Sequence, residues 1–349
     1  MLSRRRPVSC GVRFRNPPGS PAQTAGPSDF VPFLFRLAAA RPPSVPAGHV
    51  LPREEARARL ASAGPESLTW LGHACFLVRI GGLTLLTDPF LSDHASPLPP
   101  MGPKRYVPPG LEIEDLPDLD AIVVSHDHYD HLDERSVRRI SLKGRGDGSG
   151  GAPAAIVPSG LGPFFRERRY SDIRELSWRS GTLLRKSPSS SFSSSSISLT
   201  CLPSIHFSGR TPWGRNGTLW CSWAIEAEGL RIFFAGDTGY GPLFEELGGT
   251  HGPFDLALLP IGAYSPARIM KPVHLNPEEA VAAGRDLRAR ALVAMHWGTI
   301  VLTDEPPFEP PVRFREAARR AGFPDENAWV LRIGETRTIP KISSMKESR

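Results

Sequence analysis

The sequence predicts a mixed α/β fold, and three observations support this prediction. From about residue 68 onward, short apolar and β-branched runs are bounded by Gly, Pro and Asp, as is typical of strands that end in turns. Stretches rich in Ala, Glu and Arg lie between these runs and are typical of helices. One apolar run, 121–124, leads directly into a cluster of His and Asp residues, at the kind of strand end where α/β folds present their active sites.

The expected elements follow in chain order. We expect strands at 75–80, 83–87, 121–124, 154–157, 197–202, 222–227, 231–235, 256–259, 291–295 and 329–333. We expect helices at 53–62, 277–289 and 312–321. The second helix has the clearest start, because Asn276 is a suitable N-cap and Pro277 fits the first helical position. Strands and helices do not alternate strictly, so the sheets should be mixed and not purely parallel.

Composition limits the class of protein. A chain of 349 residues with 40% hydrophobic residues can bury one large core. Its apolar stretches are interrupted well before the roughly 18 residues of a membrane-spanning helix, so we expect none. The cysteines are far apart and form no CxxC pair, which argues against a disulfide framework and against a thiolate zinc site. We therefore expect a reducing compartment and a cytoplasmic location. These cysteines are Cys10, Cys75, Cys201 and Cys221.

The beginning of the chain is basic and rich in proline. Five arginines, Arg4, Arg5, Arg6, Arg13 and Arg15, precede the first acidic residue, Asp29, and the net charge is +6. Such a segment would be drawn to phosphate, and peripheral membrane association is the expectation that follows. A solvated tail and an organelle transit peptide stay open as alternatives, although the prolines would break a transit helix. The apolar cluster 30–37 could pack on the domain or enter a membrane surface.

The composition also suggests how the chain is divided. We expect a basic, Pro-rich and partly disordered segment at 1–50, a catalytic domain at 51–340 and a short tail at 341–349. Within the domain, the Gly-rich stretch 143–152 and the serine tract 187–196 cannot form a core, so we expect both to be mobile loops.

The strand 121–124 is followed by the pattern HxHxDH, which contributes His126, His128, Asp130 and His131. Imidazole nitrogen and carboxylate oxygen are ligands that zinc prefers, and this pattern behind an apolar strand is too specific to be read as chance. Three more candidates lie just past expected strand ends. These are His206, Asp237 and His296. Seven ligands exceed the needs of one tetrahedral ion, so we expect two Zn²⁺ per chain.

Several further strings surround these residues. They are FRNP at 14–17, TWLGHA at 69–74, TDP at 87–89, MGPKR at 101–105, SHDHYDHLD at 125–133, FFAGDTGY at 233–240, GPFDL at 252–256, PIGAY at 260–264 and HWGT at 296–299. Together they resemble the N-acyl-phosphatidylethanolamine-hydrolysing phospholipase D family of the metallo-β-lactamase superfamily. The resemblance runs from about residue 13 to residue 335 and implies an αβ/βα sandwich of two mixed sheets with helices outside.

The resemblance also implies roles for individual residues. His126, His128 and His206 would hold one zinc, and Asp130, His131 and His296 would hold the other, with Asp237 bridging both. Asp130 and His274 are the implied catalytic residues, His274 and Tyr264 are candidate substrate contacts, and His73 is a weaker candidate. Val273, before His274, departs from the glutamine expected in animal members, which puts headgroup contacts in doubt.

The implied reaction hydrolyses N-acyl-phosphatidylethanolamine to an N-acylethanolamine and phosphatidic acid. Two zinc ions would lower the pKa of a water between them and so provide hydroxide at neutral pH. The implied partners are a membrane phospholipid and a peripheral membrane surface; a homodimer stays open, and no nucleic acid is expected. Alternatives are another hydrolase of the same fold, either a sugar-phosphate lactonase or a nuclease, and a non-catalytic metal-binding homologue.

Overall fold

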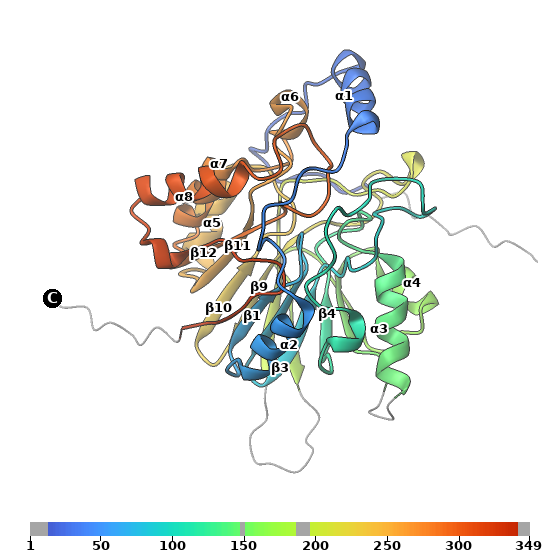
Figure 1. Cartoon of the computed structure of the whole chain (residues 1–349), viewed down its shortest axis with the longest axis vertical. Helices are drawn as coiled ribbons and strands as arrows, with labels where there is room; N and C mark the ends of the chain where they lie inside the picture. Colours follow the sequence, from blue (N-terminus) through green and yellow to red (C-terminus); the bar gives the residue numbers. More distant parts are fainter. Residues whose placement is uncertain (1–12, 147–150, 186–195, 341–349) are drawn as a thin grey trace, which may run out of the picture.

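The computed structural model describes residues 13–146, 151–185 and 196–340, which form two stacked sheets with helices on their outer faces (Figure 1). The strand order of the first sheet is β14-β1-β2-β3-β4-β5-β6, and that of the second is β13-β12-β11-β10-β9-β8-β7. The first sheet comprises β1 (Ser67–Trp70), β2 (Phe76–Ile80), β3 (Leu83–Thr87), β4 (Ala121–Val123), β5 (Ala154–Pro158), β6 (Ile173–Leu176) and β14 (Thr336–Thr338). The second comprises β7 (Gly181–Arg185), β8 (Ser196–Leu202), β9 (Ser222–Ala227), β10 (Leu230–Phe234), β11 (Leu256–Pro260), β12 (Ala291–Met295) and β13 (Ala328–Trp329).

Both sheets are mixed, as the sequence predicts, and they share one pattern. In the first sheet the strands from β14 to β3 pair antiparallel and those from β3 to β6 pair parallel. In the second sheet β7 to β10 pair antiparallel and β10 to β13 pair parallel. It follows that β1, β3 and β4 point the same way, as do β8, β10 and β12. The loops after these six strands carry the candidate site.

The strands of the first sheet divide their side chains between two cores. Phe76 and Val78 of β2 belong to the large core between the sheets, whereas Leu77 between them faces the layer of helices. Ile122 and Val123 of β4 alternate in the same way. This two-residue period buries both faces of the strand and explains why the sequence reads as continuous apolar runs.

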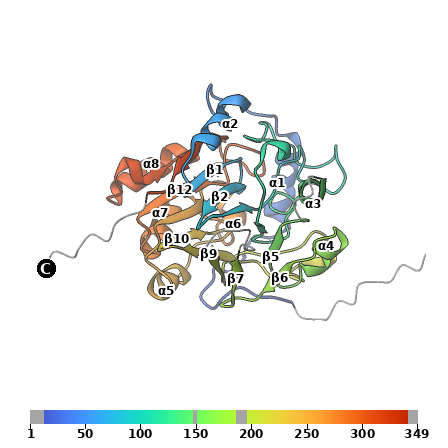
Figure 2. The same ribbon diagram turned by 90° about the horizontal axis from the view of Figure 1, so that it is seen from below.

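Helices cover the outer faces of both sheets (Figure 2). Those near the first sheet are α2 (Arg53–Ser62), α3 (Glu134–Gly146) and α4 (Gly162–Glu167), and those near the second are α5 (Leu243–Thr250), α7 (Pro277–Asp286) and α8 (Pro310–Arg320). The predicted cap of α7 is confirmed, because Asn276 Oδ1 accepts a hydrogen bond from the Glu279 amide at 2.8 Å. Two more helices, α1 (Pro27–Ala39) and α6 (Ala267–Met270), lie together beyond one end of the sandwich. The 3-10 turns are η1 (Ile113–Asp115), η2 (Pro212–Gly214) and η3 (Asp325–Asn327).

The Gly-rich stretch 143–152 was expected to be a loop throughout, which is wrong for its start. Residues 143–146 are the last turn of α3, and the Gly151 amide donates to Gly144 O at 3.0 Å. A Cβ on residue 144 would lie 2.4 Å from Gly151 O, so glycine there permits this close approach of the chain. Residues 147–150, nearly all of the serine tract and the tail 341–349 lie outside the described residues.

The beginning of the described chain is attached to the domain by specific contacts. The Phe14 amide donates to Asn216 O at 2.9 Å, and Gln23 Nε2 donates to Ile269 O at 3.0 Å. Three arginines of the basic segment, Arg4, Arg5 and Arg6, and also Cys10 lie outside the described residues. Among the residues that the structure does describe, no helix combines the length and apolar character that crossing a membrane would require.

Candidate metal centre

The seven predicted ligands converge at one edge of the sandwich. The loop after β4 supplies His126, His128, Asp130 and His131, and the loops after β8, β10 and β12 supply His206, Asp237 and His296. Four ligands therefore come from the first sheet and three from the second. The geometry confirms that these residues are neighbours, with two groups whose ligand atoms lie within 4.8 Å of one another. Their assignment as ligands stays a proposal.

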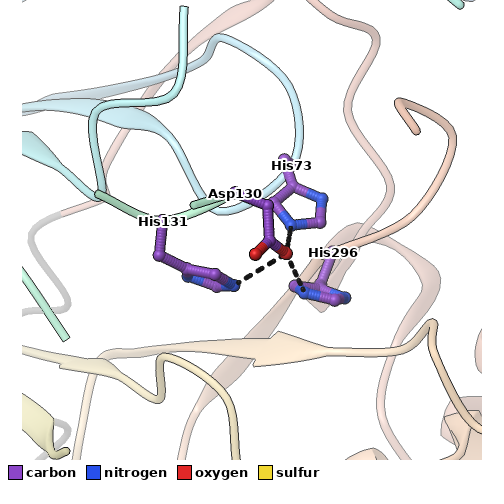
Figure 3. A group of neighbouring side chains, drawn as sticks. All are labelled: His73, Asp130, His131 and His296. Carbon is purple, nitrogen blue, oxygen red and sulfur yellow. Dashed lines mark hydrogen bonds and ion pairs between the residues drawn. The ribbon is translucent and has the colours of Figure 1, made fainter. Parts of the chain in front are cut away.

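One group, called the second metal group below, contains Asp130, His131 and His296, together with His73 from the loop after β1 (Figure 3). Asp130 Oδ2 lies 3.5 Å from His131 Nε2 and 3.7 Å from His296 Nε2. Two ligands of one tetrahedral zinc, each about 2.1 Å from the ion, would lie about 3.4 Å apart. The observed separations are close to that value.

The other group, called the first metal group below, contains His126, His128, His206 and Asp237. His126 Nε2 and His206 Nε2 lie 2.8 and 3.3 Å from His128 Nδ1. Asp237 faces both groups: its Oδ2 is 3.6 Å from His206 Nε2 and 3.2 Å from His131 Nε2, while its Oδ1 is 3.2 Å from His296 Nε2. A single carboxylate between the groups is the arrangement that a bridging ligand requires.

Unpaired buried atoms show that the cluster fits metal ions. His131 Nε2, His296 Nε2 and Asp237 Oδ1 are buried and have no hydrogen-bond partner among the described residues. Burying such atoms without partners costs free energy, and here they face one another. A divalent cation among them would satisfy all three.

The electrostatics of the two groups differ. Burial holds the pKa of His126 and of His206 well below the usual value, so both rings are neutral at pH 7. Burial acts in the same direction on His131 and His296, but Asp237 and Asp130 outweigh it. These carboxylates raise the pKa of His131 well above its usual value and that of His296 to about 9. A metal at the second group must therefore displace protons.

A second layer of side chains orients the ligand rings. Asp88 Oδ2 accepts hydrogen bonds from His131 Nδ1 at 2.7 Å and from Ser125 Oγ at 2.6 Å. Ser125 Oγ in turn accepts from His126 Nδ1 at 2.9 Å, and Val273 O accepts from His206 Nδ1 at 3.0 Å. Each of these bonds leaves the Nε2 of the ring free to bind metal.

Asp88 belongs to the TDP string, but the sequence did not predict a role for it. Its position one residue beyond β3, a strand that runs in the same direction as β4, is the signal that could have identified it. Asn16 was missed in the same way. Its Oδ1 accepts from the His206 amide at 2.9 Å and from Trp220 Nε1 at 3.0 Å, so the beginning of the chain supports a ligand loop.

A pocket of about 480 Å³ opens over the two groups. Its floor includes His128, His206, Asp237 and His296, and its other lining residues are largely apolar. The apolar residues are Pro21, Phe30, Phe33, Leu34, Phe207, Ala263, Ile269, Met270, Pro272, Val273 and Leu302. Arg215 lines the same pocket and adds a positive charge.

The two predicted substrate contacts lie in different places. His274 lines the pocket, and its buried Nδ1, 3.9 Å from Asp237 Oδ2, has no hydrogen-bond partner among the residues that the structure describes. Tyr264 is not among the residues that line this pocket; its hydroxyl donates to Glu309 Oε1 at 3.2 Å, and it shares a smaller hollow with His274. The structure thus places His274 beside the metal groups, whereas Tyr264 lies outside the pocket.

Comparison with known proteins agrees with this geometry. The family model described as the beta-lactamase superfamily domain matches residues 84–297 of the sequence. A Caenorhabditis elegans protein, N-acyl-phosphatidylethanolamine-hydrolyzing phospholipase D 1, is 40% identical over 277 residues, which are 76% of this chain and 74% of that protein. An uncharacterized protein of Mycobacterium tuberculosis is 42% identical over 257 residues, or 72% of this chain, and the match spans only 64% of the mycobacterial protein.

Among solved structures, Igni18, a metallo hydrolase from Ignicoccus hospitalis, covers 78% of this chain and 98% of its own, with a TM-score of 0.55 and 21% identity. That likeness shows the fold alone. The family match and the identity to the worm protein show more. The chain belongs to the metallo-β-lactamase superfamily, in the family of the N-acyl-phosphatidylethanolamine-hydrolysing phospholipases D.

Proposed function

We propose that this protein is a zinc-dependent phosphodiesterase that hydrolyses N-acyl-phosphatidylethanolamine to an N-acylethanolamine and phosphatidic acid. The observation that carries the proposal is the apolar pocket directly over the candidate metal groups. A lipid can place acyl carbon in such a pocket while its phosphate reaches the polar floor. A nucleic acid or a sugar phosphate would gain little from these apolar walls, so the nuclease and lactonase alternatives are weaker.

The proposed ligands are those implied by the sequence. His126, His128 and His206 would hold one zinc, Asp130, His131 and His296 the other, and Asp237 would contact both. When bound, the two ions would supply an activated water and neutralise charge on the phosphate.

Other side chains act on the substrate directly in this proposal. Arg215 offers a guanidinium to the phosphate. Burial lowers the pKa of His274 to about 4, so its ring is neutral at pH 7. It would therefore stabilise the leaving oxygen by donating a hydrogen bond and would not act as an imidazolium acid.

Helix α1 supplies the proposed contact with the membrane. Phe33 is buried and lines the pocket, while Leu34 and Phe35 are 57% and 73% exposed on the same helix. The helix is held in place by ion pairs, from Arg268 to Asp29 at 3.3 Å and from Arg36 to Asp304 at 2.6 Å. A fixed helix with exposed apolar side chains beside the pocket would guide a lipid from an interface to the metal groups. Peripheral association from the cytoplasm is the corresponding proposal for its location.

The test is a product assay with zinc-loaded protein and N-acyl-phosphatidylethanolamine in mixed micelles. We expect N-acylethanolamine and phosphatidic acid in equal amounts. The Asp237→Ala variant controls for contaminating lipases, and parallel reactions contain RNA and a sugar-phosphate lactone. Hydrolysis of one of these and not of the phospholipid would refute the proposal, and zinc binding without any turnover would favour the non-catalytic alternative.

A further inference from the structure

His73 has a position that the proposed ligand set leaves unexplained. It is 2% exposed, and its Nε2 lies 2.8 Å from Asp130 Oδ2, the oxygen that also faces His131 and His296. That separation is the length of a hydrogen bond. The two other nitrogen atoms are 3.5 and 3.7 Å from the same oxygen, which suits ligands of a common ion better.

The main chain of His73 is tied to the other sheet. Its carbonyl oxygen accepts from the His296 amide at 3.1 Å, and its own amide is 2.9 Å from Thr299 Oγ1. His73 thus contacts Asp130 of the first-sheet ligand loop through its side chain and the His296 loop of the second sheet through its backbone.

The backbone at this residue is strained. His73 has φ +54°, in the left-handed region that few residues other than Gly adopt, although Asn, Asp and His do so more often than the rest. The turn that holds it is closed by hydrogen bonds from the Cys75 amide to Gly72 O and from the Leu71 amide to Cys75 O. A strained conformation persists only when its surroundings fix it, and it is often found at functional sites.

We propose that His73 is a positioning residue for the second metal group: its Nε2–H donates to Asp130 Oδ2 and its backbone fixes the His296 loop, so that ligands from both sheets face one ion. This inference rests on the proposed ligand roles of Asp130 and His296. It makes His73 part of the support of that group and not a further ligand.

Two substitutions that differ by one methylene separate these roles. His73→Gln places an amide nitrogen about as far from Cβ as Nε2, so it retains the donor, whereas the side chain of His73→Asn is too short to reach Asp130. Asparagine tolerates positive φ well, so the loss in this variant is not due to the backbone. Asp130→Ala tests the ligand assignment separately.

The readouts are zinc per chain and the dissociation constant of each zinc, measured by competition with a chelator. We expect His73→Gln to bind two ions, and His73→Asn to bind the second about 10- to 100-fold more weakly while the first is retained. The retained first ion and an unchanged circular dichroism spectrum show that the variant is folded.

The inference is overturned if His73→Asn binds both ions as the wild type does, or if His73→Gln loses the second ion as fully as His73→Asn. The latter result would make His73 itself a ligand. If Asp130→Ala keeps both ions, the proposed ligand set fails first, and the two failures are thereby distinguished.

Discussion

Asp237 directs its two carboxylate oxygens to different histidines, Oδ2 to His131 and His206 and Oδ1 to His296. We predict that Asp237→Asn lowers kcat/KM by at least about 100-fold with little change in fold, because a neutral amide is a poor bridge between two cations. Steady-state kinetics on the zinc-loaded variant would measure this. Activity within tenfold of wild type would show that Asp237 does not bridge the ions.

The carboxylates of Asp237 and Asp130 also make the second metal group sensitive to pH. In the metal-free protein they raise the pKa of His131 and His296, the latter to about 9, so protons occupy this group at neutral pH. These raised values stabilise the metal-free fold below about pH 6.5, and this contribution is lost as the pH rises through about 9. Zinc must displace the protons, so its affinity for the second group should increase between pH 6.5 and 9.

Isothermal titration across this pH range would measure that trend, and the protons released can be obtained from buffers of different ionisation enthalpy. The first group is the internal control, since burial already keeps His126 and His206 neutral. A second-site affinity that is flat across the range would contradict the prediction.

At the scale of single residues, the proposed ligands could be predicted from the sequence, but the hydrogen bonds that orient them could not. His126, His128, Asp130 and His131 stand in one pattern, which carries its own chemical signal. Asp88 lies just beyond a strand end, which could have marked it as a candidate. Its hydrogen-bond partner is 43 positions away, and that of Asn16 is 190 positions away, so no local pattern identifies these partners. Tyr264 shows the converse, because it belongs to the PIGAY string and yet its hydroxyl turns toward Glu309.

At the scale of elements, α1 combines two roles that the apolar cluster 30–37 could not separate in sequence. Phe33 packs inward and Phe35 points outward. We predict that Phe35→Ser weakens liposome binding about tenfold or less and slows hydrolysis of membrane-presented lipid, while cleavage of a short-chain soluble analogue is unchanged. Phe33→Ser is the matched control, and it should slow cleavage of both substrates because it alters the pocket.

Vesicle sedimentation and the two activity assays would check this prediction. Equal loss on both substrates in Phe35→Ser would reject the membrane contact and leave the proposed zinc chemistry untouched.

The hairpin of β7 and β8 permits another prediction. Arg185 pairs with Ser196 at the end of this hairpin where residues 186–195 join the two strands, and β8 runs from there toward His206. Arg185 and Ser196 therefore lie at the edge opposite the metal groups. We predict that replacing 187–195 by a short Gly-Ser link changes kcat/KM less than about twofold. A large loss of activity in a variant with unchanged thermal stability would contradict the prediction that these residues do not act at the metal groups.

The ten predicted strands are present, with ends shifted by a few residues, but four others were missed. β6 and β7 lie at sheet edges and are partly exposed, and β7 contains a single buried residue, Leu184. Edge strands bury too little apolar surface to show a strong pattern. β14 is three residues long and is defined by pairing with β1, a partner about 270 positions away that no sequence window includes.

For the whole molecule, the metal groups lie between the sheets, and this gives them a role in stability as well as catalysis. Four proposed ligands follow β4 of the first sheet and three follow strands of the second, so bound ions would hold both halves to one point. Several buried nitrogen and oxygen atoms of the cluster also have no partner among the described residues, and bound metal would supply one. Removing the metal should therefore lower the stability of this chain more than that of an enzyme whose metal ligands all come from a single loop.

We predict two zinc ions per folded chain by elemental analysis, and a drop in unfolding temperature when a chelator removes them. Binding to the native state alone stabilises by RT ln(1 + [L]/Kd), or about 4 kcal/mol per ion at a free concentration 1,000 times Kd. Loss of both ions should lower the transition by roughly 10 to 25 °C for a chain of this size. Because His296 is a proposed ligand of only one of the two ions, His296→Ala should remove that ion and about half of this shift. A chain that binds one ion or none when fully folded, or that melts at the same temperature with and without chelator, would refute the two-ion centre.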